Sequence, residues 1–349
     1  MPNKTPEPLS TLAIGSVPFD TAAEALILMG EALDIPAHPQ MVKLTPWEDM
    51  LLSAASGFPA IEVDAQNNIR VAEKGREEAM ADFYEKYYSG DLDFLALDKR
   101  SSLGFEEFLS YAENNPLFGG QFLKSQVVGP LTFGQAVKVE GQNNLSDAPF
   151  LLEIASLALG GKAALAAARI RAKGREPIVF FDEPGLTGYG SAFSTLSQET
   201  VISSLSAAVE AAKSKGPVLV GCHVCGNTDW GLLTKAGLDI INFDAFEFME
   251  TVCLYPRQIG DFVKGGGLLA FGVVPTRDFD QSVSASRLAA LVRGGWEKLA
   301  SKGADLDSLR ASTLITSACG LGSLSPEKAR GILEIIPKVK EELLCDLRS

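Results

Sequence analysis

The chain has 349 residues, of which 46% are hydrophobic and 21% charged, and its formal net charge is −13. This composition is that of a globular protein, and it excludes long disorder or a disulfide scaffold as a description of the whole chain. The acidic balance offers no basic footprint for nucleic acid and disfavours anionic membrane surfaces. Residues 1–8 lack an apolar signal core, and charges interrupt the most apolar stretch, 150–168, so we expect a cytosolic protein without a membrane span.

Apolar runs and helical patterns alternate along the chain. Residues 11–18 and 122–129 read as two early strands, and residues 35–120 are less regular, with helices expected at 74–88 and 105–114. Later strands are expected at 177–182, 217–223, 239–243, 268–273 and 313–317. Later helices are expected at 197–213, 229–236, 256–264, 283–302 and 326–344.

This alternation determines the expected fold class. Strands that alternate with helices indicate βαβ units and a parallel sheet. No glycine-rich turn follows residues 11–18, which argues against a dinucleotide-binding fold. With an eighth strand hidden in the irregular segment, the pattern fits a single α/β domain over residues 1–349. The expected fold is a (β/α)8 TIM barrel with its active site at the C-terminal face of the strands.

The most informative segment is Cys222-His223-Val224-Cys225, which ends an apolar strand and precedes a Gly-Asn turn. Side chains alternate along a strand, so His223 and Cys225 share one face and Cys222 points away. An imidazole and a thiolate at this spacing suit Zn²⁺. The alternative is that the thiols are small buried hydrophobes and that His223 is a satisfied core histidine.

Two further strand ends favour the metal site. The strand at 239–243 runs into an acidic tip that contains Glu247, and Cys319 follows the last strand. In a barrel these positions meet at one mouth, so three loops deliver nitrogen, sulfur and oxygen donors to the same place.

Other strand ends carry polar residues with two interpretations each. Asp182 and Glu183 close the strand at 177–182, either to recognise a cationic group at the mouth or as a solvated capping pair. Ile14-Gly15-Ser16 end the first strand, where a glycine permits close backbone approach, although a plain turn explains the pattern equally well. His38 reads as a loop residue. The remaining cysteines read as packing or incidental: Cys222, Cys253 and Cys345.

Together these segments resemble the zinc-dependent methyltransferases of the superfamily that contains cobalamin-independent methionine synthase and uroporphyrinogen decarboxylase. The motifs that carry the resemblance are Thr11 to Pro18, Phe181-Asp-Glu-Pro-Gly-Leu186, His223-Val-Cys225-Gly-Asn227 and Ala318-Cys319-Gly-Leu321. Their order spans nearly the whole chain. The resemblance implies a TIM barrel that methylates a thiol.

Residue by residue, the resemblance implies four zinc ligands: His223, Cys225, Glu247 and Cys319. Asp244 is an alternative to Glu247. The resemblance also implies a binding site for an amino-acid acceptor, with Asp182 contacting the ammonium group: Ile14, Gly15, Ser16 and Asp182.

Several features of the family are missing. The full synthase has two barrels and about twice this length, and its catalytic histidine after the seventh strand has no counterpart in residues 272–278. The family's tryptophan after Gly-Pro-x-Thr is also absent after Thr132, and its His-Gly-Glu motif is not found.

These missing features serve a methyl-folate donor, whose amine leaves poorly unless a general acid protonates it. A methylcobamide needs no such acid. We therefore expect a zinc-dependent methyltransferase that moves a methyl group from a methylcobamide, carried on a corrinoid protein, to L-homocysteine; methyl-tetrahydrofolate is the less favoured donor. Three alternatives stay open: methylation of another thiol such as coenzyme M, a uroporphyrinogen-decarboxylase-like reaction, and a non-catalytic zinc-binding barrel.

Overall fold

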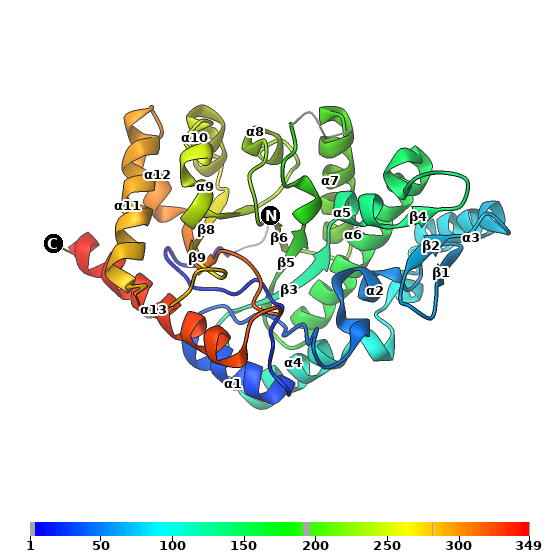
Figure 1. Cartoon of the computed structure of the whole chain (residues 1–349), viewed down its shortest axis with the longest axis horizontal. Helices are drawn as coiled ribbons and strands as arrows, with labels where there is room; N and C mark the ends of the chain where they lie inside the picture. Colours follow the sequence, from blue (N-terminus) through cyan, green and yellow to red (C-terminus); the bar gives the residue numbers. More distant parts are fainter. Residues whose placement is uncertain (1–3, 191–195, 281, 349) are drawn as a thin grey trace.

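The main element of the computed structural model, which describes residues 4–190, 196–280 and 282–348, is a six-stranded parallel sheet. Its strand order is β3-β5-β6-β7-β8-β9. The strand bounds are β3 Phe122–Val128, β5 Glu176–Asp182, β6 Leu219–Val224, β7 Ile240–Asp244, β8 Leu268–Val274 and β9 Thr313–Ser317. Figure 1 shows the sheet curled into a half-barrel with helices around its outside. These strands confirm the six predicted between residues 122 and 317, within one or two residues at each end.

Two extended segments from the first part of the chain lie beside the edges of this sheet. Four isolated parallel bridges hold them there: Thr11–Ile315, Leu12–Ile35, Ser16–Gln40 and Ala37–Lys124. Residues 11–16 thereby join β9, and residues 35–40 join both residues 11–16 and β3. The second segment, which includes His38, lies within residues 35–120, where the sequence analysis expected a hidden eighth strand.

An apolar cluster fills the inside of the curved sheet. It draws residues from all six strands and from both extended segments: Leu12, Ile35, Phe122, Ile178, Phe180, Leu219, Ile240, Leu268, Ala270 and Leu314. Because side chains alternate along a strand, the intervening residues, such as Val179 and Phe181 in β5, face outward into the larger core under the helices. We call the inner cluster the floor of the sheet.

Helices connect the strands and cover the outer face. Those predicted from the sequence are present: α3 Arg76–Tyr88, α4 Leu103–Asn114, α7 Gln198–Lys213, α8 Trp230–Leu233, α10 Pro256–Lys264, α11 Ala285–Ser301 and α13 Pro326–Arg348. Others were not anticipated: α1 Ala22–Ala32, α2 Met50–Ala55, α5 Pro130–Ala136, α6 Pro149–Ala172, α9 Ala245–Val252 and α12 Leu306–Ala311. Side-chain caps mark the starts of some of these helices; Ser197 Oγ, for example, accepts the backbone N–H of Thr200 at the first turn of α7.

Helix α6 occupies the apolar stretch noted in the sequence. Within the described residues it is the one helix whose length and composition would let it cross a membrane, and 78% of its most apolar window is buried inside this structure. It packs against β3, β5 and α7. A core helix of a globular protein has this character.

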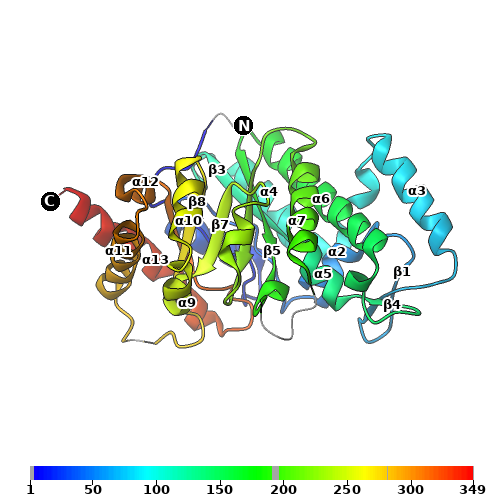
Figure 2. The same ribbon diagram turned by 90° about the horizontal axis from the view of Figure 1, so that it is seen from above.

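An elaboration lies between the second extended segment and α6. It contains α2, α3, α5 and a small sheet of order β1-β2-β4, with bounds β1 Ile61–Val63, β2 Ile69–Val71 and β4 Lys138–Val139. Short 3-10 helices complete it at Pro46–Glu48, Asp93–Leu95, Lys99–Ser101 and Leu145–Asp147. Figures 1 and 2 both place α3, β1 and β4 at one end of the molecule.

Candidate metal centre

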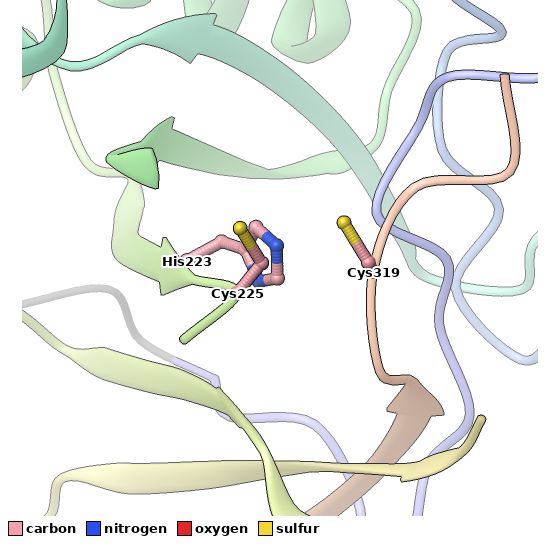
Figure 3. Close-up of side chains that lie close together, drawn as sticks. All are labelled: His223, Cys225 and Cys319. Atoms are coloured by element: carbon pink, nitrogen blue, oxygen red, sulfur yellow. The ribbon is translucent and has the colours of Figure 1, made fainter. Parts of the chain in front are cut away.

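Three of the predicted metal ligands lie together at the carboxyl ends of β6 and β9. The ligand atoms of His223, Cys225 and Cys319 are all within 4.8 Å of one another. His223 is in β6 and Cys225 directly follows that strand, whereas Cys319 lies two residues past β9. Figure 3 shows Cys319 facing the other two side chains from the opposite side of the site. Residues about 95 positions apart in sequence thus converge, as the strand-end argument predicted.

The alternation expected along β6 is also present. Cys222 is fully buried in the outer core, while His223 and Cys225 lie in the cluster. The outward position of Cys222 agrees with its assignment to packing.

Asn242 orients the imidazole, and the sequence analysis did not identify this residue. It lies beside His223 in the register of β6 and β7. Its amide nitrogen donates to Ala270 O at 2.8 Å, so its Oδ1 faces His223 Nδ1, which must then carry the proton. His223 Nε2 is buried without a hydrogen-bond partner in the described part of the chain. Its lone pair is therefore free for a ligand, which is the usual arrangement at a metal-binding histidine.

The two thiols differ in their electrostatic surroundings. The adjacent Cys319 side chain, together with His223, holds the pKa of the Cys225 thiol well below its ordinary value. The same proximity to Cys225 raises the pKa of Cys319. One thiolate forms readily and the second needs a cation to replace its proton, as a bound divalent metal does.

The donor set fits a zinc ion. Zinc binds thiolate sulfur at about 2.3 Å and imidazole nitrogen at about 2.0–2.1 Å, and its sites usually combine such ligands in a tetrahedron. A free imidazole nitrogen and two sulfurs within 4.8 Å of one another supply three of four positions.

The fourth predicted ligand, Glu247, is not a member of this close group. It is exposed in the first turn of α9, and its backbone N–H donates to Asp244 Oδ1 at 3.0 Å. Asp244, the alternative, is buried, and burial raises its pKa to about 6. Asp244 is the last residue of β7, the neighbour of β6 in the sheet, and Glu247 follows in α9. The role of Glu247 stays a prediction.

Asp182 and Glu183 are adjacent acids with different environments. Asp182 pairs with His223 in the register of β5 and β6, and its buried Oδ1 lacks a hydrogen-bond partner among the described residues. Burial raises the pKa of Asp182, against the opposing charge of Lys124. Glu183 instead caps α5, accepting the backbone N–H groups of Leu131 and Thr132 at 3.0 and 2.8 Å. Glu183 therefore caps a helix, as one interpretation predicted, but it is fully buried and not solvated. Asp182 is left facing the cluster.

The segment Ile14-Gly15-Ser16 lies against the loop that carries Cys319. Ser16 O accepts the backbone N–H of Leu321 at 2.9 Å. Gly15 has a φ of +141°, and a Cβ there would come within 2.2 Å of the Gln126 side chain. The close approach predicted for this glycine is thus present, against β3. The hydrogen bond from Leu321 to Ser16 places the end of the first segment beside the loop of Cys319.

The second histidine is not part of this centre. His38 is buried, hydrogen-bonded to Ser125 Oγ at 2.9 Å, and stacked edge-on against Phe105 of α4. Burial, aided by the charge of Lys124, lowers the pKa of His38 to about 3. His38 is therefore neutral at physiological pH.

Comparison with solved structures connects this site to a known fold. A B12-independent methionine synthase from Shewanella sp. W3-18-1, in complex with selenomethionine, superposes with a TM-score of 0.60 at 16% identity, covering 97% of this chain and 99% of that one. The chain shares the fold of this methionine synthase. The mutual coverage also means that this synthase chain is about as long as the present one.

The other structural matches are too distant to support a conclusion about this chain. A β-1,4-mannanase (TM-score 0.45, 11% identity, covering 97% of this chain and 99% of that one) and the β-mannanase of Alicyclobacillus acidocaldarius (0.44, 10%, covering 98% of each) are more distant structural matches. No protein-family model matches the chain, and no curated protein has a similar sequence. The methionine-synthase-like fold and the His-Cys-Cys cluster are thus independent observations, one from the backbone and one from the side chains.

Proposed function

We propose that the protein is a zinc-dependent thiol methyltransferase whose acceptor is L-homocysteine. The observation that carries this proposal is the convergence of His223, Cys225 and Cys319 at the strand ends of a methionine-synthase-like fold. A buried imidazole nitrogen without a partner and two half-buried thiols at the ends of the strands form an arrangement that suits a catalytic metal.

The proposal includes a complete (β/α)8 barrel in one domain. Residues 11–16 and 35–40 are its first and second strands, joined to the sheet by single bridges. The floor supports this view because Leu12 and Ile35 complete the same inner layer as the six regular strands. Closing a sheet in this way removes its exposed edges.

The side chains around the centre have separate tasks. Bound zinc would ionise the acceptor thiol and hold its sulfur in place, with Glu247 as the fourth ligand. Asn242 keeps His223 Nε2 directed into the site. The free Oδ1 of Asp182 receives the ammonium group of the amino acid, and Ser16 lies beside the loop of Cys319 to position its other end. An anionic Asp182 suits an ammonium group and would repel a sulfonate, which favours homocysteine over coenzyme M.

The choice of methyl donor rests on a missing histidine: residues 272–278, where the resemblance implies a catalytic histidine, contain none. The sequence has two histidines; His223 belongs to the ligand cluster, and His38 is neutral and packed against α4. A folate amine needs protonation to leave, whereas the cobalt of a methylcobamide does not. We propose a methylcobamide on a corrinoid protein as the donor, although the structurally similar synthase is named B12-independent.

Two measurements test the proposal. Metal analysis of the purified protein should find about one zinc per chain, and methionine should form from homocysteine and methylcobalamin. Parallel assays should supply methyl-tetrahydrofolate as donor and coenzyme M as acceptor. Turnover with the folate that equals or exceeds that with methylcobalamin would overturn the donor assignment. A protein without zinc, inactive with every thiol, would overturn the function itself.

A further inference from the structure

A cavity that is separate from the metal centre lies outside the sheet, on the side of β3 that faces the helices. It has a volume of about 90 Å³, far above the roughly 10–15 Å³ that one water needs. Its lining residues come from the second extended segment, α2, α4, β3, α6 and the short 3-10 helices before α4. None of the candidate zinc ligands lines it. It is therefore a separate space from the metal centre.

The wall of this cavity contains a buried lysine that the proposed reaction does not use. Lys162 of α6 is 4% exposed, and it forms no ion pair with any residue that the structure describes. Its Nζ donates to Ser56 Oγ and to Leu95 O, each at 2.8 Å. A protonated lysine has three N–H donors, so one of them has no acceptor among the residues that the structure describes.

Among the described residues, the other ionisable groups of the wall form no ion pair with this lysine. Both oxygens of Glu48 are occupied by backbone N–H groups, at 2.5 Å from Met41 and 2.7 Å from Gly104. Arg169 at the rim is paired with Glu106, and His38 is uncharged. A buried charge without a partner is costly, and an anionic ligand in the cavity would supply the missing partner.

The remaining lining indicates what else the ligand contains. Leu97, Val127 and Leu165 supply apolar lining. Hydrogen-bonding side chains also line the cavity: Gln40, Ser53, Ser101, Ser125 and Gln126. One buried cation beside an apolar wall matches a single negative charge on a short hydrocarbon body. A phosphate, with a higher charge, is usually held by several cations or by a run of backbone amides.

We infer that this cavity is a binding site for a small organic monocarboxylate, whose carboxylate pairs with Lys162 and whose alkyl chain packs on Leu97, Val127 and Leu165. Ligand size is limited by the cavity, so acids of about four carbons are the expected class. The site is independent of the methyl-transfer proposal, because neither the candidate zinc ligands nor the residues predicted to bind the acceptor line the cavity.

Calorimetric titration of the zinc-loaded protein with butyrate tests this inference. Butyrate should bind saturably, and its uncharged amide, butyramide, should bind at least tenfold more weakly because it cannot pair with the ammonium. Lys162→Met should weaken butyrate binding at least tenfold, whereas Lys328→Met, at an exposed lysine of α13, should leave it unchanged. Burial lowers the pKa of Lys162 to about 7, so butyrate affinity should also fall between pH 6.5 and 8.5 as the ammonium loses its proton.

A second variant keeps the inference testable if Lys162→Met does not fold. Val127→Phe leaves the lysine in place and fills the cavity, so it should abolish butyrate binding while thermal unfolding shows an intact fold. Unchanged binding in a folded variant of either kind would overturn the inference. Absence of saturable butyrate binding, or binding of inorganic phosphate in its place, would overturn it as well.

Discussion

The inside of the sheet changes character between its floor and its carboxyl end. The floor is a layer of aliphatic and aromatic side chains that is closed to solvent. At the carboxyl end, Asp182 Oδ1 and His223 Nε2 are buried without hydrogen-bond partners in the part of the chain that the structure describes. Each such atom costs about 1–3 kcal/mol. The comparison indicates that the floor stabilises the fold, whereas the mouth retains unsatisfied groups for ligands to complete.

The largest expected effect is on zinc content and activity, and it follows from removal of a sulfur ligand at the mouth. Cys225→Ser and Cys319→Ser should each lose zinc, and activity should fall by about 10³-fold or more, because the remaining donors hold the ion weakly. The fold should survive, since neither side chain belongs to the floor. Zinc analysis, thiol-methylation assays and thermal unfolding provide the measurements. Cys345→Ser, at an exposed position of α13, is the matched control; global unfolding of the ligand variants would instead indicate a structural metal.

A change in the floor should have the opposite profile. Leu314→Ala removes a side chain that is 1% exposed and should lower the free energy of unfolding by about 2–5 kcal/mol. Zinc content at low temperature should stay at the wild-type value. Denaturant unfolding and metal analysis measure the two quantities. Loss of zinc without loss of stability would contradict the claim that the floor stabilises the fold and the mouth binds the metal.

Asp182→Asn tests the proposed ammonium contact. A hydrogen bond to a charged group contributes about 1.5–3 kcal/mol, so the KM for homocysteine should rise roughly 10- to 100-fold. Turnover of 4-mercaptobutanoate, which is homocysteine without its amino group, should be unaffected. Equal losses with both thiols would show that Asp182 acts on the metal centre and not on the ammonium.

Asn242→Ala examines how the imidazole is held. Loss of a hydrogen-bonding partner behind a metal-bound histidine typically weakens metal affinity about 10- to 100-fold. Competition with a chelator measures that affinity. Asn242→Asp, which can still accept from Nδ1, should bind zinc more tightly than the alanine variant; the reverse order would contradict the tautomer that we assign.

The smallest effect concerns the acid beside Asp182. Burial raises the pKa of Glu183 to about 7, above the ordinary 4.5 that applies in the unfolded chain. The folded protein therefore binds the proton more tightly, and the stability contributed by this group is lost as pH rises through about 5 to 7. Glu183→Gln should reduce this decline by on the order of 1–3 kcal/mol. Denaturant unfolding at a series of pH values measures this decline in the free energy of unfolding. The same dependence on pH in the wild type and the variant would refute a raised pKa for Glu183.

The sequence predicted the strand-end residues well because both the alternation along β6 and the position of strand ends are local properties. The pairing of His223 with Cys225 on one face needed only the first rule. The arrival of Cys319 at the same mouth also needed the expected barrel, which brings the ends of separate strands together. The resemblance to methionine synthases agrees with the fold found by comparison.

Other features depended on contacts between distant residues. Residues 35–40 contain two prolines and form only isolated bridges, so no strand pattern marks them. Asn242 acts through the register of β6 and β7, although a polar residue in an apolar strand was a usable signal. The cavity beside Lys162 arises where β3 meets α2, α4 and α6, and α6 reads in sequence simply as an apolar stretch.

The most direct test of the central claim is X-ray absorption spectroscopy of the zinc-loaded protein, with and without homocysteine. The resting spectrum should fit two sulfurs at about 2.3 Å with nitrogen and oxygen donors at about 2.0–2.2 Å. Addition of homocysteine should raise the sulfur count to three, because the acceptor thiol joins Cys225 and Cys319. A sulfur count that does not change with homocysteine, in a sample that retains its zinc, would contradict the account.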